Sequence, residues 1–99
     1  GFQNNVTDVQ EGDMLAISLQ ELDESGEIKE GGVVKEETFL ALKDLNNEQL
    51  KDDLLTATIG DHFDFDIYTI EDKEAAYIRK HILGLEEEQT VNNQFRLTI

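Results

Sequence analysis

Cysteine is missing from this sequence of 99 residues. The chain therefore has no disulfide framework and no thiolate ligands for zinc. Long apolar runs are missing as well: no segment approaches the roughly 20 residues that span a membrane, and no basic segment followed by an apolar core stands at the N-terminus. We expect a protein without a membrane anchor or secretion signal, with the cytoplasm as its default location.

Basic residues are few, because 8 lysines and arginines stand against 23 aspartates and glutamates, for a formal net charge of −15. Such a charge repels nucleic-acid backbones and anionic membrane surfaces over a Debye length of about 10 Å. We therefore expect no nucleic-acid partner and no membrane partner. Low-complexity segments are also missing, and the hydrophobic residues, 38% of the chain, are patterned. This favours one folded domain with a single core over a disordered chain.

The first half of the chain predicts strands joined by turns. Residues 13–22 alternate between apolar and polar positions, as in a half-buried strand. The sequence Asp-Glu-Ser-Gly at 23–26 has the composition of a tight turn, so we expect a hairpin with the segment that follows. Two glycines at 31–32 permit a bend before a short strand at 38–42.

The second half predicts two helices and two strands. From Asn46 or Asn47 to about Thr58 the chain shows an amphipathic helical pattern with an asparagine as N-cap, and 61–68 then alternate as in a central strand. Residues 71–85 favour a second helix, with Gly84 at its C-terminal end, and 94–99 alternate as a last strand. This order indicates an α+β fold in which one helix covers one face of an antiparallel sheet.

The order of these elements, with several short segments, resembles the FKBP-like middle domain of the bacterial chaperone trigger factor over residues 10–99. Gly-Glu-Ile-Lys-Glu-Gly-Gly at 26–32 follows the first strand, where the family has a segment similar to Gly-Glu-Glu-Phe-Glu-Gly-Gly. A glycine, an acidic residue and an alternating strand follow the first helix from position 60 onward, as in the family. The helical insert at 74–89 is similar to the version of this domain in trigger factors of Bacteroidetes-type bacteria.

The resemblance implies an FKBP-like antiparallel curled sheet wrapped around one α-helix, with an extra helix inserted before the last strand. It also implies a single domain over residues 1–99, a fragment of a larger chaperone, with 1–9 as an N-terminal extension. An isomerase of this family rotates Xaa-Pro bonds by holding the prolyl ring against aromatic and apolar walls, without a covalent intermediate. Such a site needs aromatic walls more than titratable groups, so we assign no catalytic residue and expect no cofactor.

Carried over from the family position by position, the substrate-binding candidates are Glu30, Phe39, Leu50 and Tyr77. Glu30 keeps the family's acidic residue, but Lys29 replaces the phenylalanine beside it, so one pocket wall is lost. Leu50 replaces the aromatic residue of the helix that forms the pocket floor. Phe39 is the candidate for a surviving aromatic wall, although a shift of one residue in register would place Thr38 there instead.

In the family a flap covers the prolyl pocket between the last two strands, and here a helix over 72–83 replaces it. Ala75, Ile78 and Ile82 form one apolar side of this helix, which we expect to pack against the open end of the sheet. Tyr77, rather than Tyr68, is expected to supply a hydroxyl at the pocket rim. Together these substitutions predict that the isomerase activity is weak or lost.

Functions from different classes stay open. The first is an FKBP-type prolyl isomerase acting on Xaa-Pro segments of nascent or unfolded polypeptides, and the second is a non-catalytic acidic interaction or spacer module in a chaperone. A third, an unrelated acidic binding domain, requires a different fold. A cleft ringed by Phe39 and a tyrosine favours the first, and a cleft filled by the helix favours the second. The family's basic ribosome-binding motif is missing, so ribosome contact would come from other domains, and we expect the fragment to be a monomer.

One predicted strand carries residues of metal-binding types. His62, Asp64 and Asp66 share a strand face, which could present nitrogen and oxygen ligands to a divalent metal. Their alternation with phenylalanines explains them as the solvated face of a strand, and no EF-hand loop surrounds them. We therefore expect no metal. His81, near a helix C-terminus, is interpreted as a capping or surface residue.

Overall fold

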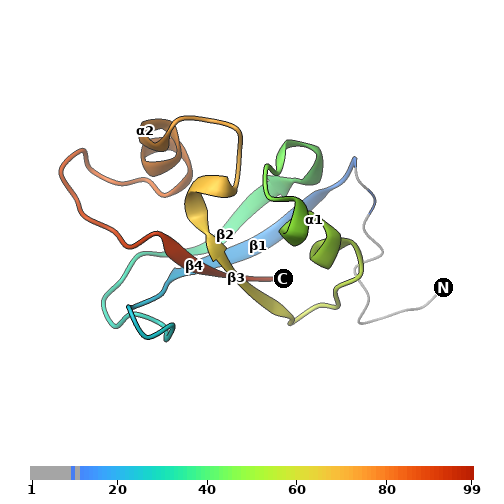
Figure 1. The fold of residues 1–99 in the computed structure, drawn as a ribbon, viewed down its shortest axis with the longest axis horizontal. Coiled ribbons are helices and arrows are strands. Elements are labelled where there is room, and N and C mark those ends of the chain that lie inside the picture. The colour runs from blue at the N-terminus through green and yellow to red at the C-terminus, as the bar shows by residue number, and fades with distance from the viewer. Residues whose placement is uncertain (1–9, 11) are drawn as a thin grey trace.

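The structure is a computed structural model that describes Gln10 and residues 12–99. Its four strands form one antiparallel sheet in the order β2-β1-β4-β3 (Figure 1). Their bounds are β1 Met14–Glu21, β2 Val34–Ala41, β3 His62–Asp66 and β4 Gln94–Thr98. Helix α1 spans Glu48–Leu55, and α2 spans Ala75–Tyr77 and continues as a π-helical turn over Ile78–Ile82. The expected N-terminal extension, 1–9, lies outside the described residues.

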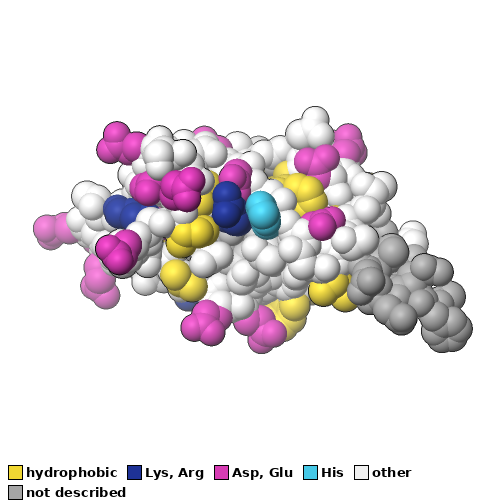
Figure 2. Space-filling view, turned by 90° about the horizontal axis from the view of Figure 1, so that it is seen from below, with side chains coloured by type: hydrophobic (Ala, Val, Ile, Leu, Met, Phe, Trp, Pro, Cys, Tyr) yellow, Lys and Arg dark blue, Asp and Glu magenta, His cyan; other side chains and the backbone are white. Residues whose placement is uncertain are grey.

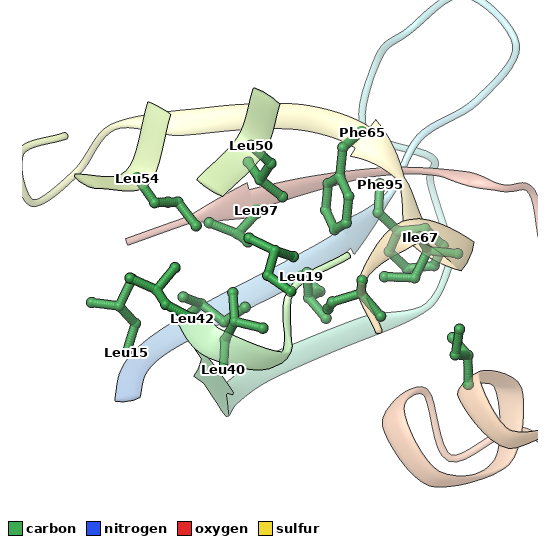
Figure 3. Close-up of a cluster of buried hydrophobic side chains, with 14 of the residues drawn as sticks. Leu15, Leu19, Leu40, Leu42, Leu50, Leu54, Phe65, Ile67, Phe95 and Leu97 are labelled. Atoms are coloured by element: carbon green, nitrogen blue, oxygen red, sulfur yellow. The ribbon is translucent and has the colours of Figure 1, made fainter. Parts of the chain in front are cut away.

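The core lies between α1 and the inner face of the curled sheet, as Figure 3 shows. Leu50 and Leu54, the buried residues of α1, point toward Leu97 at the centre of the sheet. Leu15 and Leu19 are buried on the same face, because alternate residues of a strand point to the same side. The predicted α+β, FKBP-like fold with a curled sheet around one helix is therefore confirmed.

The predicted central position of the strand at 61–68 is wrong, because the last strand, β4, lies between β1 and β3 and leaves β3 at an edge. Alternation identifies a buried face, and an edge strand has one too: Phe65 is buried while Phe63 is only half-buried. The alternating residues therefore indicated the strand but not its neighbours.

The turn after β1 is confirmed, but the hairpin arm is short. Asp23 accepts hydrogen bonds at Oδ1 from the backbone N–H groups of Ser25, at 2.8 Å, and Glu27, at 3.0 Å. Gly26 has a φ of 87°, a left-handed conformation that glycine adopts without strain. Only one bridge, between Leu22 and Ile28, continues the ladder beyond β1.

Helix α1 begins where the sequence predicts, because the side-chain oxygen of Asn47 accepts a hydrogen bond of 2.9 Å from the backbone N–H of Leu50. Replacing Asn47 by alanine leaves this N–H without its cap, so we expect the free energy of unfolding to fall by about 1 kcal/mol. Asn46→Ala is the matched control, since this side chain precedes the cap and is exposed. Urea unfolding of both variants measures the difference, and equal stabilities would contradict the capping role of Asn47.

No helix within the described part of the chain, Gln10 and residues 12–99, is long and apolar enough to cross a bilayer.

Candidate functional site

A cleft of about 160 Å³ lies between the second half of β2 and the helical segment 75–82. The residues that line it come from four parts of the chain and include Ile17, Thr38, Phe39, Leu40, Ile70, Glu71, Tyr77, His81 and Ile82. Binding pockets for small molecules have about 300–1,000 Å³, so this cleft offers room for one side chain rather than for a compact ligand.

The helical segment that forms one wall is shorter than predicted. Its first turn is α-helical, and the N–H of Leu83 then bonds to the carbonyl of Ile78, as in a π-helical turn. The expected apolar side is correct for Ile78, which is fully buried, but wrong for Ala75, which is exposed. Ile82 is half-buried and Leu83 takes the second buried position, because the wider turn rotates the following residues around the helix axis.

The end of this segment follows the prediction. Gly84 has a φ of 67°, so the chain leaves the helix through the left-handed conformation that glycine favours. A hydrogen bond of 2.9 Å from the N–H of Leu85 to the carbonyl of Arg79 closes the last turn. With Ile78 and Leu83 held in the core, the segment is fixed as a wall of the cleft rather than hanging free as a flap.

Three side chains form a stack at the rim of the cleft. The rings of Tyr77 and His81 lie with their centroids 4.7 Å apart at an angle of 43°. The Nζ of Lys73 lies 5.3 Å from the centroid of the Tyr77 ring, within reach of a cation–π interaction. Tyr77, at 41% exposure, therefore presents a partly engaged ring and a hydroxyl at the rim of the cleft.

The register between β1 and β2 decides which residue of β2 points inward. Thr38 lies opposite Ile17 and Phe39 opposite Ala16. Because Ile17 is buried on the inner face, Thr38 shares that face, while Phe39 is 63% exposed on the outer face and reaches the cleft only at its rim. Thr38 therefore points inward and Phe39 lies at the rim, and both residues line the cleft.

The four candidate residues lie in different places. Phe39 and Tyr77 both line the cleft. Leu50 is buried in the core under α1, and Glu30 is exposed in the turn that precedes Gly31, so neither lines it. The structure thus brings two of the four together.

Sequence reasoning missed the contribution of other residues to the cleft. Ile70 forms part of its floor and is almost fully buried, and Glu71 adds a carboxylate. His81 was interpreted as a capping or surface residue; it is exposed, but it also lines the cleft beside Tyr77. The spacing of Tyr77 and His81, four residues apart on a helix, was the signal that could have shown their contact.

The polar face of β3 has structural partners. Arg96 of β4 donates two hydrogen bonds to the carboxylate of Asp64, at 2.8 and 3.0 Å. These bonds hold the pKa of Asp64 below its usual value, against the opposing effect of partial burial. Asp66 accepts a hydrogen bond of 2.9 Å from the backbone N–H of Tyr68. Within the described part of the chain, no three side chains of the metal-binding types gather in one place.

The surface of the domain is strongly acidic. Figure 2 shows acidic side chains spread over the face that it displays, with only a few basic ones among them. The described residues that line the cleft include the carboxylate of Glu71 and neither lysine nor arginine. An approaching polypeptide therefore meets a negative field, which favours basic segments over acidic ones.

Comparison with known proteins agrees with this geometry. The family model described as "Probable trigger factor, FKBP-like domain" matches residues 3–99. Searches of curated proteins and of solved structures return no match. The match covers nearly the whole chain, and the resemblance of the short segments, the element order and the curled sheet all agree with it. This chain belongs to the family of FKBP-like domains of probable trigger factors.

Proposed function

We propose that this domain contacts nascent or unfolded polypeptides, including Xaa-Pro segments, as part of a cytoplasmic trigger-factor chaperone, with prolyl isomerase activity that is weak or lost. The observation that carries the proposal is the construction of the cleft. Among the described residues that line it, the aromatic ones are Phe39, Tyr77 and His81, all exposed at the rim, while Thr38 occupies the inward position.

This cleft lacks the enclosed walls that catalysis of Xaa-Pro rotation requires. The barrier to rotation is about 18–20 kcal/mol, and each tenfold acceleration requires about 1.4 kcal/mol of preferential binding to the twisted amide. That preference comes from walls that hold the prolyl ring and exclude water. Here the rim is open to solvent. Leu50, which replaces the aromatic floor of the family's pocket, is buried in the core and does not line the cleft.

A working isomerase is the second candidate function. It is favoured by one observation, the presence of Phe39 and Tyr77 in the same cleft. A polypeptide could close the cleft by covering its rim, which would bring both rings into contact with a proline. The two candidates predict different rates with the same substrates.

A protease-coupled assay with a series of Xaa-Pro peptides distinguishes them. With micromolar protein we expect isomerisation rates within about twofold of the uncatalysed rate, because the cleft lowers the barrier to Xaa-Pro rotation only slightly. Strong acceleration that Tyr77→Ala removes, but that Ile59→Ala leaves intact, would establish the second candidate instead. Ile59 is the matched control, since it is an exposed apolar residue outside the cleft.

The chaperone part of the proposal requires binding without catalysis. We expect the chain to slow the aggregation of a denatured, proline-containing protein when it is added in molar excess. Failure to bind any unfolded polypeptide would contradict this part, whatever the isomerase assay gives.

A further inference from the structure

Among the strands that the structure describes, β2 forms one edge of the sheet and pairs with β1 alone. An edge strand presents a row of backbone N–H and C=O groups that have no partner strand, and an extended peptide can add to such a row. The pairing of residues 38–41 with β1 is regular, since each residue has one partner in register. This half of β2 is therefore suited to accept another strand.

The other half of β2 is disturbed by a bulge. The register shifts between Ile17 and Leu19, which pair with Thr38 and Lys35, so Glu36 and Glu37 together lie opposite the single residue Ser18. Both glutamates are exposed. Bulges and charges of this kind protect an edge from pairing with further strands. Because every copy of the chain carries a net charge of −15, these carboxylates disfavour a second copy as the partner.

Exposed apolar side chains gather around this edge. Of the six large hydrophobic residues that are exposed in the described part of the chain, four lie on β1, on β2 or in the cleft beside them: Met14, Val34, Phe39 and Tyr77. The register places Phe39 beside Ala16 and Ala41 beside Met14 on the outer face. We call Met14, Ala16, Phe39 and Ala41 the outer strip.

The two sides of the edge suit the alternation of a strand. Successive side chains of an added strand point to opposite faces. Those on the inner side meet the cleft, which has room for one side chain among Ile17, Thr38 and Leu40. Those on the outer side lie against the outer strip, with Phe39, at 63% exposure, as the largest contact.

We propose that the edge of β2 at 38–41 binds an extended polypeptide segment that alternates apolar and basic residues, which adds to the sheet beside β2. The apolar residues of such a segment all point to one face and lie against the outer strip. The basic residues point to the cleft side, where they offset the negative charge of Glu71 and, at the bulge, of Glu36 and Glu37. The inference rests on the proposed function and names the class of segment that the domain binds.

The test titrates the isotope-labelled chain with three synthetic peptides and follows the backbone amides by NMR. The first peptide alternates valine and lysine, the second alternates valine and glutamate, and the third repeats the first with alternate backbone nitrogens methylated. We expect the first peptide to shift the signals of 38–41 and to protect their amides from exchange. The other two should bind at least about tenfold more weakly, because one lacks charge complementarity and the other lacks the hydrogen-bond donors.

Matched variants locate the surface. Phe39→Ser should weaken binding of the valine–lysine peptide about tenfold, whereas Ile59→Ser, which removes an apolar side chain of 60% exposure elsewhere, should not. Reversal of Glu36 and Glu37 to lysine should weaken binding, and reversal of Glu87 and Glu88, which gives the same change in net charge, should do so much less. The amide spectra of all four variants report whether they are folded.

Binding that shifts β3 instead of β2, or that tolerates backbone methylation, overturns the edge proposal while the domain still binds polypeptides as proposed. If both charge variants bind the valine–lysine peptide equally weakly, only the net charge of the chain matters for binding, and this result also overturns the edge proposal. If neither these peptides nor a denatured protein binds, the proposed function fails as well. Shifts confined to 38–41 and the outer strip, with the expected order of affinities, support the proposal.

Discussion

Phe95→Ala is expected to lower the free energy of unfolding by about 3–5 kcal/mol, a large part of the stability of a small domain. Phe95 lies on β4, between Glu21 of β1 and Phe65 of β3, and its side chain has 0% exposure. Removal of the ring loses its burial and leaves a cavity where both neighbouring strands and the core meet. Urea unfolding of the chain, followed by circular dichroism, measures the loss.

Phe39→Ala is the matched control, because it removes the same ring from the exposed outer face. It should change the stability by no more than about 0.5 kcal/mol. If Phe95→Ala does not fold, Phe95→Leu gives a smaller, measurable loss from the same position. Equal effects at positions 95 and 39 would contradict the burial described for β4.

Local patterns predicted the elements of the fold well. The alternation in 13–22 and 94–99 gave β1 and β4, and Asn47 and Gly84 marked helix ends, because capping depends on residues close in sequence. The position of β3 at an edge could not be read in this way, since strand order depends on contacts between distant segments. The bulge at 36–37 similarly removes alternation from the start of β2, so only its second half was predicted.

The cleft was harder to predict than the fold, because shifts of a single residue change which side chains point into it. The bulge in β2 fixes whether Thr38 or Phe39 points inward, and a slip of one residue exchanges the two. The π-helical turn rotates the residues that follow it, so Leu83 rather than Ile82 takes the second buried position. The family resemblance named Phe39 and Tyr77, which line the cleft, but it could not place Leu50 in the core instead of the floor.

The sequence also indicates the structural role of Glu21. Glu21 has the same parity as the buried Leu15, Ile17 and Leu19, so the alternation of β1 already placed its carboxylate on the inner face. It is the one buried charged side chain in the described part of the chain, at 2% exposure. A buried charge is tolerated when it is hydrogen-bonded, so such a position indicates a structural bond network.

The carboxylate of Glu21 joins two distant segments to β1. Oε1 accepts a hydrogen bond of 2.9 Å from the N–H of Val33, in the segment before β2. Oε2 accepts one of 2.8 Å from the N–H of Asn92, before β4, and one of 3.2 Å from Nζ of Lys29. A Cβ added at Gly32 would approach both Oε1 of Glu21 and Cβ of Lys29 to 3.0 Å, so a larger residue would have to displace these side chains.

We therefore expect Glu21→Ala to lower the free energy of unfolding by about 2–4 kcal/mol, because each buried N–H left without a partner costs about 1–3 kcal/mol. Glu21→Gln should cost less, since its amide oxygen can keep one of the bonds. Glu30→Ala is the matched control, a glutamate exposed in the neighbouring turn. Equal losses at positions 21 and 30 would contradict the bond network.

The pH dependence of this loss has a definite sign. Burial raises the pKa of Glu21, but the hydrogen bonds from Asn92, Val33 and Lys29 outweigh it and hold the pKa below the usual 4.5. A carboxyl whose pKa is lower in the folded state stabilises the fold when ionised, and this stabilisation disappears as the pH falls from 4.5 through the lowered pKa. Asp23 and Asp64, whose pKa values are also lowered, lose their contributions in both proteins and cancel from the comparison. The difference in free energy of unfolding between the wild-type chain and Glu21→Gln should therefore be constant near neutral pH and become smaller in acid. A difference that stayed constant or grew below pH 4.5 would show that ionisation of Glu21 does not stabilise the fold.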